Sequence, residues 1–144
     1  MYEFRGYDEK TERWIHGKGL FQSKHSSIIC DASGKHITVK SETVGKKYIL
    51  RDSTNTPIYQ GDIIRDSFID HGNTYSRYYR IVEDELSVWA EELWRDYDLD
   101  CETMEVTRLH NIKYSGEHVG IDYFNTYKPT VVVGNIWQNP ELLK

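Results

Sequence analysis

The feature that most constrains this chain is the alternation of apolar and polar residues over short stretches separated by turn-forming clusters. Residues 36–40 (HITVK) form one such stretch. Successive side chains of a strand point to opposite faces, so a period of two predicts strands. Three pairs of stretches flank turn clusters and predict β-hairpins: 2–7 with 12–16, 27–30 with 36–40, and 63–69 with 74–82. We therefore predict a mainly β fold.

A different period begins at Leu86. Apolar residues follow the spacing i, i+3, i+4, i+7, i+8 and i+11, at Leu86, Trp89, Ala90, Leu93, Trp94 and Tyr97. This stripe is typical of an amphipathic helix, and Asp84 is suited to cap its start. We predict one helix near 84–97 in a β-rich α+β fold, with a strand as the alternative because residues 88–90 (VWA) also suit a sheet.

The rest of the chain predicts further strands and two regions. Strands are expected at 105–109, 112–114, 119–123 and 130–136, with a turn and a short helix-like end after them. A chain of 144 residues fits one domain or two very small ones. We expect an N-terminal β-hairpin region at 1–56 and a second region at 57–144 that contains the helix, or one compact unit formed by both.

No targeting segment and no cofactor are predicted. The first residues, MYEFRG, lack the apolar run of a signal peptide, and no stretch approaches the roughly 20 apolar residues of a membrane span. The expected location is therefore the cytoplasm. Cys30 and Cys101 do not have the spacing of a zinc motif, so we expect two reduced thiols, with one disulfide as the alternative.

Acidic residues are concentrated in one part of the chain. Ten of the 23 acidic residues lie between 83 and 105, where Arg95 is the single basic residue. This segment carries a net charge of −9, whereas the rest carries +4 and the whole chain −5. A block of one sign faces solvent or meets a surface of opposite sign. We expect a function specific to this protein to lie in this segment.

The acidic segment contains one candidate metal site. Four carboxylates occupy every second position, as at the start of a calcium-binding EF-hand loop: Asp96, Asp98, Asp100 and Glu102. The loop fails at its sixth position, where Cys101 replaces glycine, and at its twelfth, where Thr107 replaces glutamate. The alternatives are a looser divalent-cation site, with a metal-dependent hydrolase as the corresponding function, and an acidic face in solvent.

Two short strips combine basic and aromatic residues, as surfaces that bind single-stranded nucleic acid do. The first is Lys46, Lys47 and Tyr48, and the second is Arg77, Tyr78 and Arg80. Alternating lysines also protect edge strands from aggregation, which is the structural interpretation. The acidic net charge counts against nucleic acid, since attraction to phosphate dominates such affinity.

Motifs of catalysis are absent from the sequence. It contains no GxSxG, no HExxH and no GxxxxGK[ST] motif, so residues 17–19 (GKG) do not make a phosphate-binding loop. We therefore expect a protein that is not an enzyme.

Three pieces of the chain, in order, resemble the YopX family of phage and prophage proteins. They are FRGYD at 4–8 followed by RW at 13–14 and Gly17; ETVG at 42–45 followed by LRD at 50–52 and IYQGDII at 58–64; and VGNIWQNPELL at 133–143. The chain departs from the family pattern where Ile49 replaces a common glycine and where Thr54-Asn55 replaces Asn-Gly. Asparagine tolerates the left-handed conformation, so that turn is expected to survive.

The resemblance implies a β-rich fold with a small SH3-like barrel in the middle and C-terminal part, and it implies no catalytic activity. We expect the motif residues Gly61, Gly134, Trp14 and Trp137 to have structural roles, as sites of close backbone approach or as packing anchors. The leading hypothesis is a phage accessory protein, located in the bacterial host cell, that binds a protein partner or itself. A single-stranded nucleic-acid-binding protein is the alternative.

Overall fold

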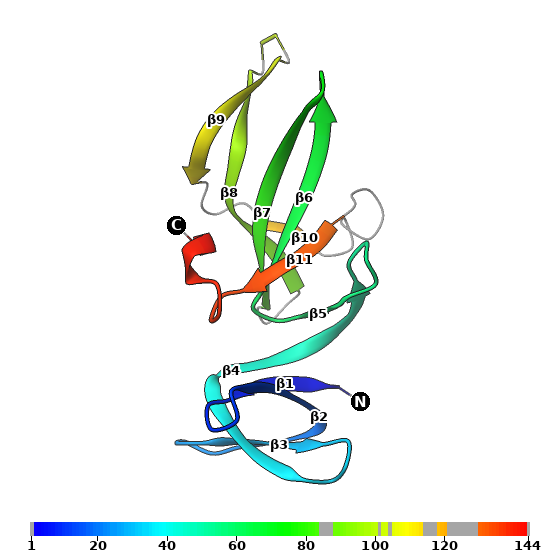
Figure 1. The fold of residues 1–144 in the computed structure, drawn as a ribbon, viewed down its shortest axis with the longest axis vertical. Helices are drawn as coiled ribbons and strands as arrows, with labels where there is room; N and C mark the ends of the chain where they lie inside the picture. Colours follow the sequence, from blue (N-terminus) through cyan, green and yellow to red (C-terminus); the bar gives the residue numbers. More distant parts are fainter. Residues whose placement is uncertain are drawn as a thin grey trace. The chain divides into compact units, whose positions relative to one another are not determined.

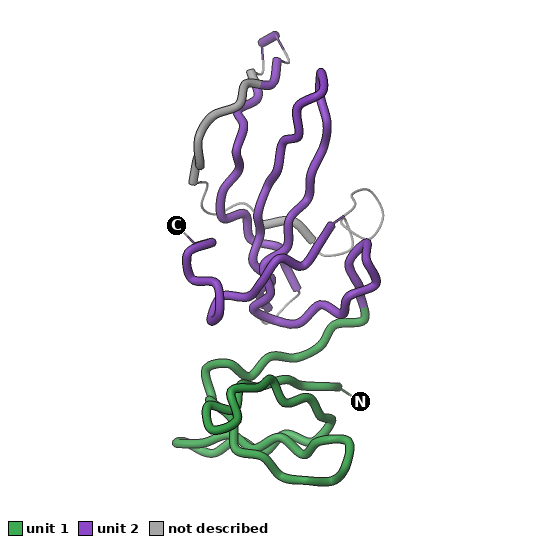
Figure 2. The backbone as a smooth tube through the Cα atoms, viewed as in Figure 1, with its two compact units in different colours: residues 1–49 green, residues 50–144 purple. Residues whose placement is uncertain are grey.

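The computed structural model describes residues 2–83, 88–100, 102, 103, 105–113, 118–120 and 130–143. For residues 100, 107–113 and 118–120 it describes the backbone alone. The structure is mainly β, as predicted, with two antiparallel sheets. It divides into two compact units, unit 1 at Met1–Ile49 and unit 2 at Leu50–Lys144 (Figure 2).

Unit 1 is a closed ring of four strands. Along the chain they are β1 (Phe4–Asp8), β2 (Arg13–Gln22), β3 (Ser27–Asp31) and β4 (His36–Arg51), whose last two residues belong to unit 2. Consecutive strands pair antiparallel, and β1 also pairs with β4, which closes the ring (Figure 1). Ile15, Ile29 and Val39 fill its interior, where apolar neighbours pack against them.

The three predicted hairpins are confirmed, and polar side chains at their turns explain why they form there. Asp8 accepts hydrogen bonds from the Lys10 amide (2.9 Å) and the Thr11 hydroxyl (2.7 Å). Gly34 has a φ of 84° in the second turn. In the third, His71 and Gly72 have φ values of 48° and 78°, as the tightest hairpin turns require.

Unit 2 contains the remaining strands and a short 3-10 helix. They are β5 (Pro57–Tyr59), β6 (Asp62–Asp70), β7 (Asn73–Glu83), β8 (Val88–Asp100), β9 (Glu105–Lys113), β10 (His118–Gly120), β11 (Thr130–Asn135) and η1 (Pro140–Leu143). The larger sheet has the order β10-β8-β7-β6-β11, and β9 also pairs with β8. The β6–β7 and β8–β9 hairpins extend in the same direction (Figure 1). The predicted helix-like end is confirmed by η1.

One face of the unit 2 sheet forms its core. Buried apolar and aromatic residues recur on β6, β7 and β8: Ile64, Tyr75, Tyr79, Ile81, Ala90, Leu93 and Tyr97. Phe68 stacks on Tyr75 with ring centroids 5.3 Å apart and meets Tyr97 edge-on at 5.1 Å. Aromatic rings therefore supply much of the apolar contact in this unit.

The predicted helix near 84–97 is wrong. Residues 88–100 form strand β8, and 84–87 lie outside the described residues. A β-bulge explains the error: Tyr78 pairs with Trp94 and Tyr79 with Glu92, so Leu93 is an extra residue in β8. The bulge changes which face of the sheet the following side chains occupy. The buried residues Ala90, Leu93 and Tyr97 therefore lie at intervals of three and four. A bulged strand thus has the apolar spacing of a helix.

The later strands differ in extent from the expectation. The two strands predicted at 105–109 and 112–114 are one strand, β9, and residue 114 is not described. The strand predicted at 119–123 is described only as β10, since 121–123 lie outside the described residues. Within the described part of the chain, no helix is long and apolar enough to span a membrane.

Candidate binding surfaces

The first predicted strip, on β4, does not make one continuous basic face. Neighbouring residues of a strand point to opposite sides, and Lys46 and Lys47 meet different partners. The Lys47 Nζ lies 3.4 Å from the Glu3 Oε2, and the Lys46 Nζ lies 4.3 Å from the centroid of the Tyr2 ring. Tyr48 follows, half-buried.

The second predicted strip, on β7, is divided between two sides of the sheet. The Arg77 Nη2 lies 2.6 Å from the Asp66 Oδ2, and the Arg80 Nη2 lies 2.8 Å from the Glu91 Oε2. The Tyr78 ring stacks on Trp94 with centroids 3.8 Å apart. The positive charge of each guanidinium is therefore paired with a carboxylate.

The predicted metal residues lie along β8 and the following turn. The Asp96 Oδ1 accepts a hydrogen bond from the Ser76 amide at 2.7 Å, which gives this carboxylate a structural role. Asp98 and Glu102 are exposed, and only the backbone of Asp100 is described. The described residues contain no group of three or more histidine, cysteine or acidic side chains that suits a metal ion. Cys30 is a free thiol, and Cys101 lies outside the described residues.

A buried polar network in unit 2 was not anticipated. Asp66 and Glu92 are each 2% exposed on the core face of the sheet. The Glu92 Oε1 lies 3.6 Å from the Arg95 Nε, and Asp66 pairs with Arg77. Burial alone lowers the pKa of Arg77, but hydrogen bonding to Asp66 and its charge raise that pKa overall. Burial raises the pKa of Tyr79 above its usual value, and the charge of Asp66 adds to the effect.

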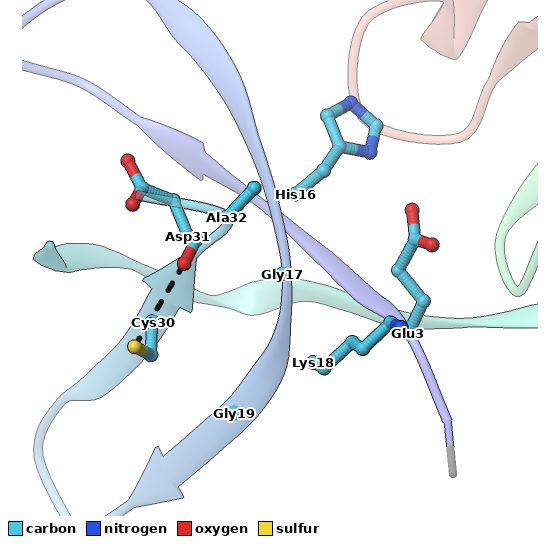
Figure 3. Close-up of a pocket in the computed structure, with 8 residues that line it drawn as sticks. All are labelled: Glu3, His16, Gly17, Lys18, Gly19, Cys30, Asp31 and Ala32. Atoms are coloured by element: carbon cyan, nitrogen blue, oxygen red, sulfur yellow. Dashed lines mark hydrogen bonds between the residues drawn. The ribbon is translucent and has the colours of Figure 1, made fainter. Parts of the chain in front are cut away.

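The sequence reasoning also missed a surface pocket on unit 1. Its volume is about 470 Å³, and its lining is Glu3, His16, Gly17, Lys18, Gly19, Cys30, Asp31 and Ala32 (Figure 3). The pocket forms at a bulge in β2, where Gly17 pairs with Asp31 and Gly19 with Cys30, so Lys18 is the extra residue. Glycines on both sides of a residue within a strand are a signal of such a bulge.

Charged residues line this pocket or act on it from neighbouring strands. The pKa of His16 is lowered by desolvation, then by the positive charges of Arg5 and Lys47, against the opposing effect of Glu3. The Asp31 Oδ1 accepts hydrogen bonds from the Ser33 hydroxyl (2.6 Å) and amide (2.9 Å). The hydroxyl contact is the main cause of a lowered Asp31 pKa.

The motif residues Trp14, Gly61 and Trp137 have structural roles, as expected. Arg5 lies over the Trp14 ring, with its Cζ 4.7 Å from the centroid, and Tyr7 meets Trp14 edge-on at 5.5 Å. In unit 2 the Trp137 ring lies directly against Gly61, whose φ is 86°. These aromatic residues act as packing anchors.

The two units carry net charges of opposite sign. The sequence of unit 1 has nine basic and six acidic residues, a net charge of +3. Unit 2 also has nine basic residues but 17 acidic ones, a net charge of −8.

Fold and surfaces together define a small, mainly antiparallel β protein of two units, whose motif residues stabilise turns and strand contacts. The chain belongs to the YopX family: the family model described as YopX protein matches residues 3–144. This confirms the resemblance seen in the sequence. A comparison with curated proteins gives no significant match.

Proposed function

We propose that this protein acts by binding rather than by catalysis, as a phage-type accessory protein in the cytoplasm of a bacterial host. Its partner is a second copy of the chain or another protein with a basic surface. The observation that carries the proposal is the separation of charge, with +3 on unit 1 and −8 on unit 2. Complementary fields of this kind steer association and select partners.

The exposed charges are placed to support such association. Unit 1 exposes Lys10, Arg13, Lys18, Lys24 and Lys35. Unit 2 exposes Asp98, Glu102 and Glu105 at the end of the β8–β9 hairpin. Unit 1 of one copy is therefore electrostatically complementary to unit 2 of another, and repetition of this contact gives an oligomer.

Size-exclusion chromatography with light scattering tests this proposal. At about 20 mM salt the mass exceeds that of one chain, and at about 500 mM salt, where screening is short-ranged, it falls. Asp98→Asn with Glu105→Gln weakens the association, while Glu12→Gln, an exposed acid of unit 1, leaves it unchanged. The proposal is wrong if the chain stays monomeric at every salt concentration and a host extract yields no partner whose binding depends on these two acids.

Binding of single-stranded nucleic acid is the second candidate, and the net charge of +3 on unit 1 favours it. The site we propose is on unit 1, at the part of the predicted strip where the Lys46 ammonium lies over the exposed Tyr2 ring. Fluorescence anisotropy with labelled oligonucleotides at about 50 mM salt tests it, because phosphate contacts are strongest at low salt. Lys46→Ala weakens binding more than Lys24→Ala does, and a flat titration excludes this function.

A further inference from the structure

The positive charge of unit 1 is concentrated on β2, β3 and the start of β4. Residues 13–40 contain five basic side chains and a single acidic one, Asp31, which gives a net charge of +4. The other residues of unit 1 contain four basic and five acidic side chains, a net charge of −1. Between residues 13 and 30 the sequence has no acidic residue. An acidic partner is therefore attracted to this part of unit 1.

The same strands carry an apolar patch on the outer face of the ring. In β3, Ile29 is fully buried in the core, so its neighbours Ile28 and Cys30 lie on the opposite face. Phe21 of β2 is paired with Ile28, and Gly19 is paired with Cys30. The Phe21 side chain is 59% exposed. The solvent face of an antiparallel sheet is ordinarily polar, and an apolar patch with a polar rim is typical of an interaction surface.

Exposed lysines lie in the loops at the two ends of β3, next to this patch. Lys24 lies between β2 and β3, three residues after Phe21. Lys35 lies directly before His36, whose ring centroid is 5.8 Å from that of Phe21. The carboxylate of Asp31 accepts a hydrogen bond from the Lys35 amide at 3.0 Å and belongs to the turn. The patch therefore combines an aromatic anchor with cations at both ends.

The end of the β8–β9 hairpin in unit 2 has the complementary composition. Asp98 and Glu105 are exposed there. Leu99 and Val106, both half-buried, are paired with each other next to these acids. Asp100 and Glu105 occupy opposite positions, and like charges at opposite positions destabilise a strand pair. A cation supplied from outside the hairpin relieves this repulsion.

We propose that the outer face of unit 1 around Phe21 receives the end of the β8–β9 hairpin of a second copy of the chain. Phe21 is the apolar anchor of this contact, and Lys24 and Lys35 face the carboxylates. The inference rests on the proposed function and names the surface that the association uses. Because the contact joins different surfaces of two copies, it repeats from head to tail. Salt weakens it, since opposite charges meet there.

Variants of the full chain test the unit 1 surface by light scattering at about 20 mM salt. Phe21→Ser and Lys24→Glu each weaken self-association about tenfold, through loss of the anchor and reversal of one charge. Ile69→Ser is the matched control for the anchor, because Ile69 is 74% exposed on unit 2. Lys10→Glu makes the same charge change outside the patch, in the β1–β2 turn, and has no effect. All four residues are exposed, so the folds are retained, which circular dichroism checks.

A mixing experiment tests whether the hairpin end is the partner of this surface. One chain carries Phe21→Ser with Lys24→Glu, and the other carries Asp98→Lys with Glu105→Lys. Each chain lacks one side of the contact, so neither associates with itself. Their mixture forms a complex of two chains, because the intact hairpin end of the first binds the intact patch of the second.

The possible results separate this inference from the proposed function. The inference alone is overturned if wild-type association depends on salt but Phe21→Ser and Lys24→Glu behave like their controls, or if the mixed variants stay monomeric. A wild-type chain that is monomeric at every salt concentration contradicts the self-association on which the inference rests. A labelled oligonucleotide whose binding is lost in Phe21→Ser, with self-association unchanged, assigns the patch to nucleic acid instead.

Discussion

At the scale of single residues, side chains in the family motifs accept hydrogen bonds from backbone amides at turns. The Asp52 carboxylate accepts hydrogen bonds from the amides of Thr54, Thr56 and Val132, each at 2.8 Å. Asp52 therefore joins the turn before β5 to strand β11, across 80 residues of sequence. Asn55 adopts a φ of 69° in the same turn, which confirms the expectation that an asparagine takes the left-handed conformation there.

Asp52 makes stability depend on pH. Burial raises its pKa, but the hydrogen bonds from Val132, Thr54 and Thr56 outweigh burial and hold the pKa below the ordinary value of 3.8. A lowered folded-state pKa stabilises the fold above pH 3.8, and this contribution is lost as the pH falls through the folded-state value. Urea unfolding at neutral and acidic pH measures the loss. In Asp52→Asn unit 2 is less stable by about 1–3 kcal/mol at neutral pH. An unchanged pH dependence in this variant contradicts the assignment.

Gly61 meets two requirements at once, a left-handed backbone and contact with the Trp137 ring. Gly61→Ala therefore costs about 2–4 kcal/mol in free energy of unfolding, from backbone strain and displacement of the indole. Gly72→Ala is the matched control, because Gly72 has a φ of 78° but nothing within 4 Å of an added Cβ. The control loses only about 1 kcal/mol. Equal losses in urea unfolding would show that the Trp137 contact contributes nothing.

At the scale of elements, β8 carries charge on both faces of the sheet. Glu92 and Arg95 lie on the core face, near Asp66 and Arg77, whereas Glu91 pairs with Arg80 on the other side. Acidic side chains of this segment, among them Glu91 and Glu92, therefore form ion pairs inside unit 2. Asp98 and Glu105, near the end of the β8–β9 hairpin, are exposed.

The two arginine–carboxylate pairs differ in burial and should differ in their contribution to stability. The Asp66 side chain is 3% exposed and the Arg77 side chain 21%, so Asp66→Asn leaves a largely buried Arg77 charge without its partner and costs about 3 kcal/mol, the lower end for a buried pair. Glu91→Gln breaks the other pair, where the Arg80 side chain is 37% exposed, and costs less than about 1 kcal/mol. Denaturant unfolding of both variants checks the difference. The double variant Asp66→Asn with Arg77→Met recovers part of the loss if the buried charge is its cause.

At the scale of the whole molecule, each unit has a core of its own. In unit 1 the core is the interior of the ring, around Ile15, Ile29 and Val39. In unit 2 it is one face of the larger sheet, which includes Ile64 and Tyr79. We therefore expect the units to unfold in separate steps.

Tryptophan positions allow these steps to be observed. Trp14 is the single tryptophan of unit 1, so in Trp14→Phe the fluorescence reports unit 2 alone. Far-ultraviolet circular dichroism reports strands in both units. In this variant the two signals give urea transitions with different midpoints. Coincident transitions would show instead that the chain unfolds as one cooperative molecule.

Local patterns in the sequence determined the β class, the three hairpins, the family and the structural role of its motif residues. These features depend on side-chain period and turn chemistry, which act between residues close in the chain. Tertiary structure decided the closed ring, the bulge that gives β8 its helix-like spacing, the ion pair between the buried Asp66 and Arg77, and the pocket of unit 1. Each arises from strand pairing or register between distant segments, and a one-residue shift in register changes which side chains meet.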